Sequence, residues 1–323
     1  MNLSTDTRLF VNPRSLASGA VGDRVFRWLT LLMALMIFVL MALIGYELAR
    51  GSNLALLKFG WGFLTSTEWD PVNERFGALP FIFGTVVSSA IALLLAVPLS
   101  IATAVYLTEL APMRLRQPIT LFIELLAAVP SVILGFWGMR VMVPWLTAHV
   151  FPGLQRVFGF LPLFQGPKYG PCLLSGGIIL AIMIVPIITS ISREILRSVP
   201  GLQREAAYAL GATRWEVTRI AVLSYAKKGL FGAVILGLGR ALGETMAITM
   251  VSGNSPQIVA SLFAPGATLT TVIANEFTEA TTDIYLNALF EIGLVLLGVT
   301  VLVNALAQLL LKTLSGPSVK PQN

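Results

Sequence analysis

The stretch Arg204–Ser224, REAAYALGATRWEVTRIAVLS, is a charged, helix-forming segment between two long apolar runs. The run before it, Tyr169–Ser192, has no charged residue, and the run after it, Gly229–Val251, has only Arg240 and Glu244. A membrane protein has little reason to place compact amphipathic helices between two membrane spans unless another protein docks there. The stretch therefore predicts a docking segment, and its flanks predict membrane helices.

The composition of the whole chain fits this interpretation. Hydrophobic residues make up 56% of the sequence and charged residues only 12%, whereas charged residues are about 25% of a soluble domain. A helix needs roughly 20 mostly apolar residues to cross the hydrocarbon core. We therefore expect an all-α membrane protein with six transmembrane helices, at Trp28–Tyr46, Gly77–Thr108, Gln117–Met139, Tyr169–Ser192, Gly229–Val251 and Ile284–Leu311.

The positive charges predict the orientation of these helices. Of 22 Lys and Arg residues, 15 lie in the alternate segments that include both ends of the chain and the loop 193–228, and six lie in the other segments. The positive-inside rule then places both termini and this loop in the cytoplasm, so the net charge of +6 indicates topology and not nucleic-acid binding. The expected organisation is a cytoplasmic lead at 1–25, a first transmembrane helix at 26–46, an extracytoplasmic loop at 47–79, a five-helix transmembrane domain at 80–311 and a cytoplasmic tail at 312–323.

The loop 193–228 is predicted to form two short helices. The first begins at Pro200-Gly201, and Gly211 ends it by adopting a backbone conformation that other residues resist. Thr213 then resembles an N-cap, with Glu216 three residues later completing a capping box. A solvated surface helix pair is the alternative, but the small side chains of Ala206 and Ala207 favour close docking.

This segment resembles the EAA loop of ABC-importer permeases, whose pattern is E-A-A, three residues, G, nine residues, I-x-L-P. The matching positions are Glu205, Ala206, Ala207, Gly211 and Leu223. Ala221 stands where Ile is usual and Ser224 where Pro is usual, so the end of the motif departs from the pattern. The resemblance implies that the loop forms a coupling helix that inserts into a groove on a separate ATPase subunit.

A second resemblance covers most of the chain, roughly residues 55–312. It is carried by FGWGFLTSTEWD (59–70), the segment 76–111 ending in YLTELA, IELLAAVPSVILGFWG (123–138), LGLGRALGETMAITMVSGN (236–254) and ANEFTEA (274–280). These segments are similar to the PstC-type permeases of the phosphate-specific ABC importer. In the sister PstA type, the Gly-Glu-Thr motif is usually followed by Ala-Pro-Leu-Leu. In this chain the same motif, residues 243–245, is followed by Met-Ala-Ile-Thr. The resemblance implies the type I ABC importer permease fold with cytoplasmic coupling helices.

Two charged residues in the fifth span are the main candidates for a substrate pathway. Arg240 and Glu244 are four positions apart and are expected on one helix face. A charge at the membrane centre costs about 2.5–3.5 kcal/mol on insertion scales. One interpretation is a structural ion pair; the other is that Arg240 offers a guanidinium fork to phosphate oxygens while Glu244 holds it. The resemblance supports the second, because phosphate permeases of this type carry these charges at matching places.

Three further residues are weaker candidates. Glu124 and Glu291 are carboxylates in predicted spans, where they would repel an anion unless paired or protonated, so we expect them to partner arginines of the cytoplasmic side or of another subunit. Pro130 and Gly135 predict a helix break at membrane depth. Ser131, next to that break, could present backbone amides to an anion.

The sequence contains no site for catalysis of its own. It has no G-x-x-x-x-G-K-[ST] phosphate-binding loop, no HExxH or GxSxG motif, and only one cysteine, Cys172, and one histidine, His149. We therefore expect no cofactor, no metal site and no ATPase site. ATP hydrolysis would lie on a partner.

The resemblance implies the partners and the location. They are two copies of a PstB-like cytoplasmic ATP-binding subunit, a PstA-like second permease and a PstS-like extracytoplasmic phosphate-binding protein, in a bacterial cytoplasmic (inner) membrane. The alternatives are the PstA-like sister role, or a permease for another oxyanion such as molybdate or sulfate. Two alternatives belong to other classes of protein. A secondary transporter or channel is expected to show inverted repeats, and we find none in the sequence. A membrane scaffold without transport would not explain Arg240 and Glu244 within a span.

Overall fold

The computed structural model describes residues 13–314, with side-chain environments for 22–312. Within these residues the chain consists of helices, connecting loops and two isolated β-bridges. It divides into two compact units, residues 1–50 and 51–323. The described part of the first unit belongs to one helix, α1 (Pro13–Gly51), whose side chains are almost all exposed from residue 22 onward.

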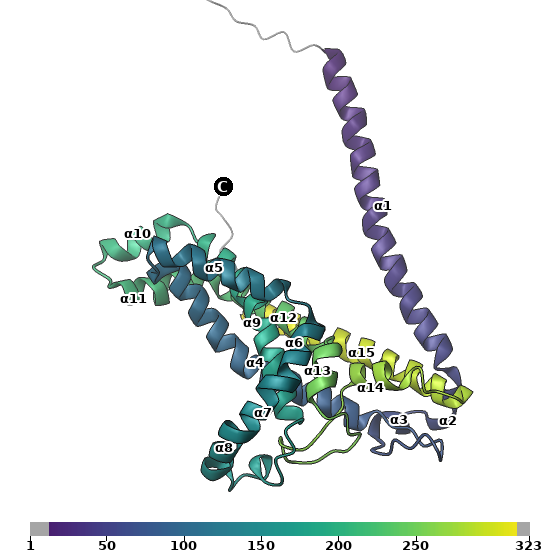
Figure 1. The fold of residues 1–323 in the computed structure, drawn as a ribbon. Helices are drawn as coiled ribbons and strands as arrows, with labels where there is room; N and C mark the ends of the chain where they lie inside the picture. The colour runs from purple at the N-terminus through teal and green to yellow at the C-terminus, as the bar shows by residue number, and fades with distance from the viewer. Residues whose placement is uncertain (1–12, 315–323) are drawn as a thin grey trace, which may run out of the picture. The chain divides into compact units, whose positions relative to one another are not determined.

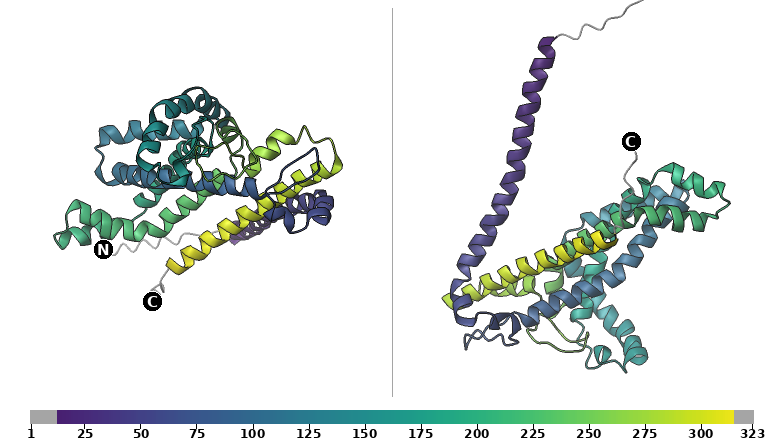
Figure 2. Two further views of the ribbon diagram at one scale, coloured as in Figure 1. Left: turned by 90° about the horizontal axis from the view of Figure 1, so that it is seen from below. Right: turned by 180° about the vertical axis from the view of Figure 1, so that it is seen from behind.

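The second unit contains the remaining helices, drawn in Figures 1 and 2. They are α2 (Asn53–Phe59), α3 (Gly62–Thr65), α4 (Leu79–Val105), η1 (Tyr106–Leu110), α5 (Met113–Ala128), α6 (Ser131–Trp137), η2 (Gly138–Met142), α7 (Val143–Trp145), η3 (Leu146–Val150), α8 (Phe151–Phe158), η4 (Pro162–Phe164), α9 (Leu173–Arg197), α10 (Gly201–Ala209), α11 (Arg214–Glu216), η5 (Val217–Leu223), α12 (Ser224–Leu242), α13 (Met246–Val251), α14 (Leu269–Glu276) and α15 (Asp283–Leu314).

Six helical runs among the described residues are long and apolar enough to cross a membrane, which confirms the predicted number. They are Gly22–Gly51, Leu79–Leu110, Ser131–Phe158, Leu173–Arg197, Arg214–Leu242 and Asp283–Lys312. Four of them overlap the predicted spans over most of their length, whereas the fifth, Arg214–Leu242, begins and ends earlier than the predicted Gly229–Val251. The first helix begins earlier and ends later than the predicted 26–46.

The third span is displaced from its predicted position, so the prediction of Gln117–Met139 was wrong. Helix α5 ends at Ala128, the chain is extended through Pro130, and α6 starts a new helical run that continues through η2, α7, η3 and α8 to Phe158. Two π-helical turns, η2 and η3, lie in this run just before Pro144 and Pro152, and the altered hydrogen-bond pattern of such turns accommodates residues without a backbone N–H. The predicted break at Pro130 is present.

The core of the second unit is the packing of α4 and α12 against α9, the most buried of the candidate spans. Close approach depends on small residues. A Cβ added at Gly177 of α9 would lie 2.5 Å from Cγ2 and 2.6 Å from Cβ of Ile91 of α4. Ser100 of α4 donates a hydrogen bond to the carbonyl of Val185, 3.2 Å away. Both contacts join α4 to α9, and the absence of a side chain at Gly177 leaves room for Ile91.

The two ends of this unit differ in structure. One end carries α10, α11 and the start of α5, and the opposite end carries α2, α3, α8 and the loop that leads into α14 (Figures 1 and 2). At the second end, Trp69 makes edge contacts with Phe76 and Phe81. Its indole N–H donates to Glu276 Oε2 at 2.7 Å, and the hydroxyl of Tyr285 donates to the same oxygen at 2.6 Å. This cluster fixes the loop after α3 to α14 and α15.

Replacing Gly177 with alanine tests the packing of α4 on α9. The new methyl group would collide with the Cβ branch of Ile91, which cannot rotate away, so we expect a loss of about 1–3 kcal/mol of stability. Thermal unfolding of the purified protein, followed by size-exclusion chromatography, measures it. Gly153→Ala in α8 is the control, since nothing lies within 4 Å of its added Cβ. Equal melting temperatures for the two variants would contradict this packing.

Candidate functional site

The fifth span is broken at the position of its charged residues. Helix α12 ends at Leu242 and α13 begins at Met246. Backbone groups freed inside a membrane must find partners within the protein. At this break, Thr270 Oγ1 donates to the backbone carbonyl of Glu244 at 2.8 Å, and the backbone N–H of Ala247 donates to Glu244 Oε1 at 3.3 Å. Glu244 therefore stabilises the break with both its backbone and its side chain.

Arg240 and Glu244 meet across this break. The distance between Arg240 Nη2 and Glu244 Oε2 is 3.7 Å; the arginine side chain is 52% exposed and the glutamate side chain 6%. The expectation that both lie on one helix was wrong, because α12 ends between them. The side chains nevertheless remain within reach of each other. Among the described residues Arg240 has no other hydrogen bond or ion pair, so most of its guanidinium N–H groups are available to a ligand.

Buried hydroxyl groups hold α14 beside the break. Thr268 caps α14, and its hydroxyl lies 3.0 Å from that of Thr270. Thr85 of α4 accepts a hydrogen bond from the backbone N–H of Leu269 at 3.0 Å. This network joins α4, α14 and the α12–α13 break. The neutral donors that fix Glu244 itself are the hydroxyl of Thr270 in α14 and the backbone N–H of Ala247 in α13.

The predicted docking segment forms a helix and a turn. Helix α10 begins at Gly201 and carries Glu205, Ala206 and Ala207, and Gly211 has φ +82°, in the left-handed region that favours glycine. The predicted capping box is confirmed: Thr213 N–H donates to Glu216 Oε2 at 2.7 Å, and Glu216 N–H donates to Thr213 Oγ1 at 3.4 Å. The second helix is longer than predicted, because α11 and η5 run directly into α12.

Apolar side chains are exposed on this segment. Leu202, Tyr208 and Leu210 all lie open, Leu210 with 90% exposure. Leu223, the last matching position of the loop pattern, differs from them because it packs against the buried cluster of Val105, Leu196 and Val222. The α10 surface is therefore free for a partner, whereas Leu223 supports the segment from inside.

An ion pair that the sequence interpretation missed anchors α10. Arg204 Nη2 lies 2.9 Å from Glu109 Oε1, and both side chains are mostly buried. Arg204 also donates to the carbonyls of Val199 and Leu196 at 2.7 and 3.0 Å. Glu109 lies in η1, directly after α4. The sequence signal for this pair was Glu109, a charged residue just past the end of an apolar span. Its partner could not be identified from the sequence because Arg204 is 95 residues away.

Glu124 and Ser131 lie near the α5–α6 break. Glu124 is 56% exposed and pairs with Arg193 of α9 at 3.3 Å, so it has the kind of arginine partner that the sequence suggested. Ser131 is the first residue of α6. The helix break therefore occurs where Pro130 predicts it. Among the described residues, neither Glu124 nor Ser131 forms a hydrogen bond or ion pair with Arg240.

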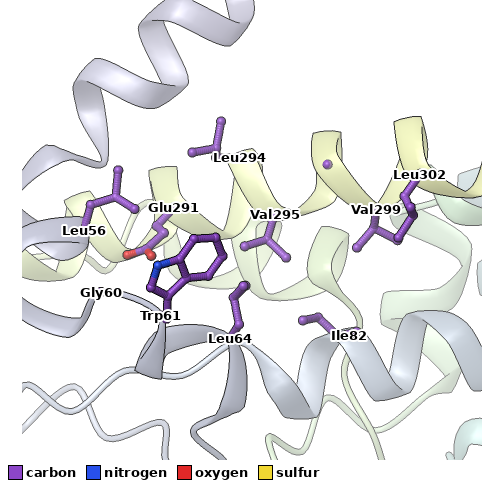
Figure 3. A pocket seen from close by; sticks show the side chains of 11 residues that line it. Leu56, Gly60, Trp61, Leu64, Ile82, Glu291, Leu294, Val295, Val299 and Leu302 are labelled. Atoms are coloured by element: carbon purple, nitrogen blue, oxygen red, sulfur yellow. The ribbon is translucent and has the colours of Figure 1, made fainter.

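Glu291 has a different environment, shown in Figure 3. Its residue is 3% exposed, and its Oε2 atom has no hydrogen-bond partner among the described residues. It lines a cavity of about 630 Å³ with Trp61 beside it and with apolar residues of α2, α4 and α15 around it. No arginine lines this cavity. The expected arginine partner is thus not supplied by the described part of this chain.

Comparison with known proteins gives a consistent result. The family model described as "Binding-protein-dependent transport system inner membrane component" matches residues 96–316. The phosphate transport system permease protein PstC of Mesorhizobium japonicum is 49% identical over 90% of each chain. The protein of the same name from Haemophilus influenzae is 46% identical, covering 90% of this chain and 93% of the relative. The probable PstC of Methanocaldococcus jannaschii is 36% identical over 89% and 93%.

Solved structures agree on the fold. A chain of a bacterial ABC transporter involved in the import of the acidic polysaccharide alginate superposes with a TM-score of 0.56 at 20% identity, over 90% of this chain and 98% of that one. A chain of the MetNI methionine ABC transporter in an inward-facing conformation gives 0.50 at 17% identity, over 74% and 95%. At this level of identity the likeness concerns the fold, which is that of type I ABC importer permeases.

If the Arg204–Glu109 pair anchors α10, breaking the pair should make α10 more mobile. Glu109→Gln keeps the side-chain shape but removes the charge that faces Arg204, so a charge-assisted hydrogen bond worth about 1.5–3 kcal/mol is lost. We expect trypsin to cleave the protein at Arg214 roughly tenfold faster, because α10 opens more often. Glu68→Gln, which breaks the exposed Arg75–Glu68 pair, is the control and should change nothing. Unchanged cleavage of the Glu109 variant would show that the pair does not hold α10.

Proposed function

This chain belongs to the family of binding-protein-dependent transport system inner membrane components, and on that premise we propose that it is a PstC-type permease subunit of an ATP-driven importer of inorganic phosphate. Relatives that bear the name of phosphate permease and are 44–49% identical over about 90% of the chain support the substrate. The observation that carries the proposal is Arg240, a guanidinium within a broken membrane span whose N–H groups are mostly free and whose counterion is held in place.

Arg240 would bind phosphate in transit. A guanidinium presents a planar fork of donors that fits two oxygens of a tetrahedral oxyanion, and it stays charged at every physiological pH. Half of the side chain is open. In a membrane, such a charge faces a water-filled path or another subunit and not lipid. The geometry therefore fits a polar path along the broken span.

Glu244 would orient Arg240 and limit its affinity. Its Oε1 is engaged by the N–H of Ala247, and its Oε2 lies 3.7 Å from the guanidinium, longer than a close charge-assisted hydrogen bond. A carboxylate at this distance competes with an arriving anion without excluding it. A transport site must bind its substrate weakly enough to release it, and a held counterion provides this weakening.

Helix α10 would couple the permease to a separate ATPase. Its exposed apolar side chains, including Leu202 and Leu210, are suited to insertion into a groove. A push on α10 would pass through Arg204 to Glu109 at the end of α4. Helices α4 and α12 both pack against α9, and α12 carries Arg240. Movement of the docking helix is thus connected to the proposed pathway through packed elements.

The proposed assembly has this chain as one permease of a heterodimer with a PstA-like second permease. Two copies of a PstB-like cytoplasmic ATP-binding subunit and an extracytoplasmic PstS-like phosphate-binding protein complete it. We place it in a bacterial inner membrane with both termini in the cytoplasm, as the distribution of Lys and Arg favours. ATP hydrolysis would take place on the partner subunits, since this sequence has no phosphate-binding loop.

Arg240 variants test the pathway role. We expect Arg240→Ala to reduce phosphate uptake to background while the complex still assembles. Arg240→Lys keeps the charge but loses the fork, so uptake should fall by about tenfold, the equivalent of one charge-assisted hydrogen bond. Uptake of labelled phosphate by cells that depend on this importer measures both, with the exposed Arg75→Gln as control. Uptake at the wild-type rate in Arg240→Ala would refute the role.

Gly211 variants test the coupling role. Its φ of +82° is unfavourable for other residues, although no atom lies within 4 Å of an added Cβ. Gly211→Val should strain the turn by about 1–3 kcal/mol and separate ATP hydrolysis from transport. Gly211→Asn is the matched control, because asparagine tolerates this conformation. ATPase activity and uptake are measured on the same preparation; an intact, coupled Val variant would contradict docking through this turn.

A further inference from the structure

A second basic site lies between α5 and α9, apart from Arg240. A pocket of about 390 Å³ is lined there by three arginines, Arg116, Arg193 and Arg197, together with Gln117, Thr120 and the carboxylate Glu124. The start of α5 is at the same end of the unit as α10 (Figure 1). On the proposed topology, this end faces the cytoplasm.

The arginines of this pocket have more donors than the chain supplies acceptors for. Arg116 donates from Nη2 to the carbonyl of Thr108 at 3.0 Å, and its Nε is buried without a partner among the described residues. Arg193 donates from Nη1 to Thr120 and from Nη2 to Glu124 at 3.3 Å. Its side chain is only 13% exposed, and its Nε likewise has no partner in the described chain.

Arg197 is the third guanidinium, and its side chain forms no hydrogen bond or ion pair with any described residue. Three positive charges therefore meet one carboxylate at this pocket, and Glu124 is more than half exposed. A buried donor of a charged group is costly to leave without an acceptor. The surplus of positive charge among the lining residues favours an anion with several acceptor oxygens.

We propose that this pocket binds a phosphate-type oxyanion. Its oxygens would accept from the guanidinium groups of Arg116, Arg193 and Arg197, which line the same pocket. The ligand is either inorganic phosphate on the cytoplasmic side or the phosphate of an anionic phospholipid headgroup, which present the same chemistry. The site does not depend on Arg240 being the transport site.

The pocket also adjoins the docking helix. Arg116 binds the carbonyl of Thr108, and the next residue, Glu109, binds Arg204 of α10. An anion that orders Arg116 would therefore order the segment to which α10 is attached. An anion bound in the pocket would therefore stabilise the attachment of α10 to the segment after α4.

Protection of a single cysteine in the pocket tests the proposal. Gln117→Cys places a thiol among the lining residues, in the full-length protein reconstituted with the subunits that copurify with it. The native Cys172 is buried, and burial raises the pKa of its thiol, so it should stay unreactive toward a maleimide. The rate of alkylation of this chain is measured by mass spectrometry in phosphatidylcholine vesicles, in the same vesicles with inorganic phosphate, and in vesicles that contain phosphatidylglycerol without phosphate.

We expect at least one anion to slow the alkylation. Slowing by inorganic phosphate alone identifies the free ion, and slowing by phosphatidylglycerol alone identifies the lipid headgroup. Adding Arg197→Gln should raise the concentration needed for half-protection by roughly tenfold or more, since one charge-assisted contact is lost. Arg219→Gln, an exposed arginine of the same cytoplasmic segment outside the pocket, is the control. Protection should persist in an Arg240→Ala background, which separates this site from the proposed transport site.

Three results would overturn the proposal. They are equal alkylation rates in all three vesicle conditions, protection that Arg197→Gln leaves unchanged, and protection that Arg219→Gln weakens as much as Arg197→Gln does. The last would mean that the anion responds only to the general positive charge of this face.

Discussion

A guanidinium cannot face lipid hydrocarbon, and this constraint organises the centre of the molecule. Arg240 lies near the end of an apolar span, with half of its side chain open within this chain. The insertion cost of such a charge is about 2.5–3.5 kcal/mol, so it must meet water, a ligand or another subunit. The helix that carries it ends two residues later, and the freed backbone is engaged by Thr270 while Glu244 faces the charge. The break, the buried carboxylate and the hydroxyl network all follow from accommodating one arginine.

A chain of packed elements connects the proposed pathway to α10. The Arg204–Glu109 pair attaches α10 to the segment after α4, and α4 packs on α9 through Gly177. Helix α12 packs on α9 as well. Because cores of this density move as packed bodies and do not deform smoothly, displacement of α10 reaches α12 as a shift of whole helices. This would be the physical basis for driving the proposed transport path from a partner protein.

The sequence predicted the features that are encoded locally. Long apolar runs predicted the number of spans, turn and cap chemistry predicted the roles of Gly211 and the Thr213–Glu216 box, and Pro130 marked a helix break. Features that depend on contacts between residues far apart in sequence could not be predicted from local patterns. The third span was misplaced because π-helical turns allow Pro144 within a helical run. Glu109 and Arg204 are far apart in sequence, and no described residue supplies the arginine partner that we expected for Glu291.

Transport by the purified, reconstituted complex tests the central claim most directly. Proteoliposomes that contain this chain with its copurifying permease and ATPase are supplied with labelled phosphate, the extracytoplasmic binding protein and ATP. The account predicts accumulation of phosphate that requires both ATP and the binding protein and that persists in an excess of sulfate or molybdate. Accumulation that proceeds without ATP, or uptake of sulfate or molybdate in place of phosphate, would contradict it.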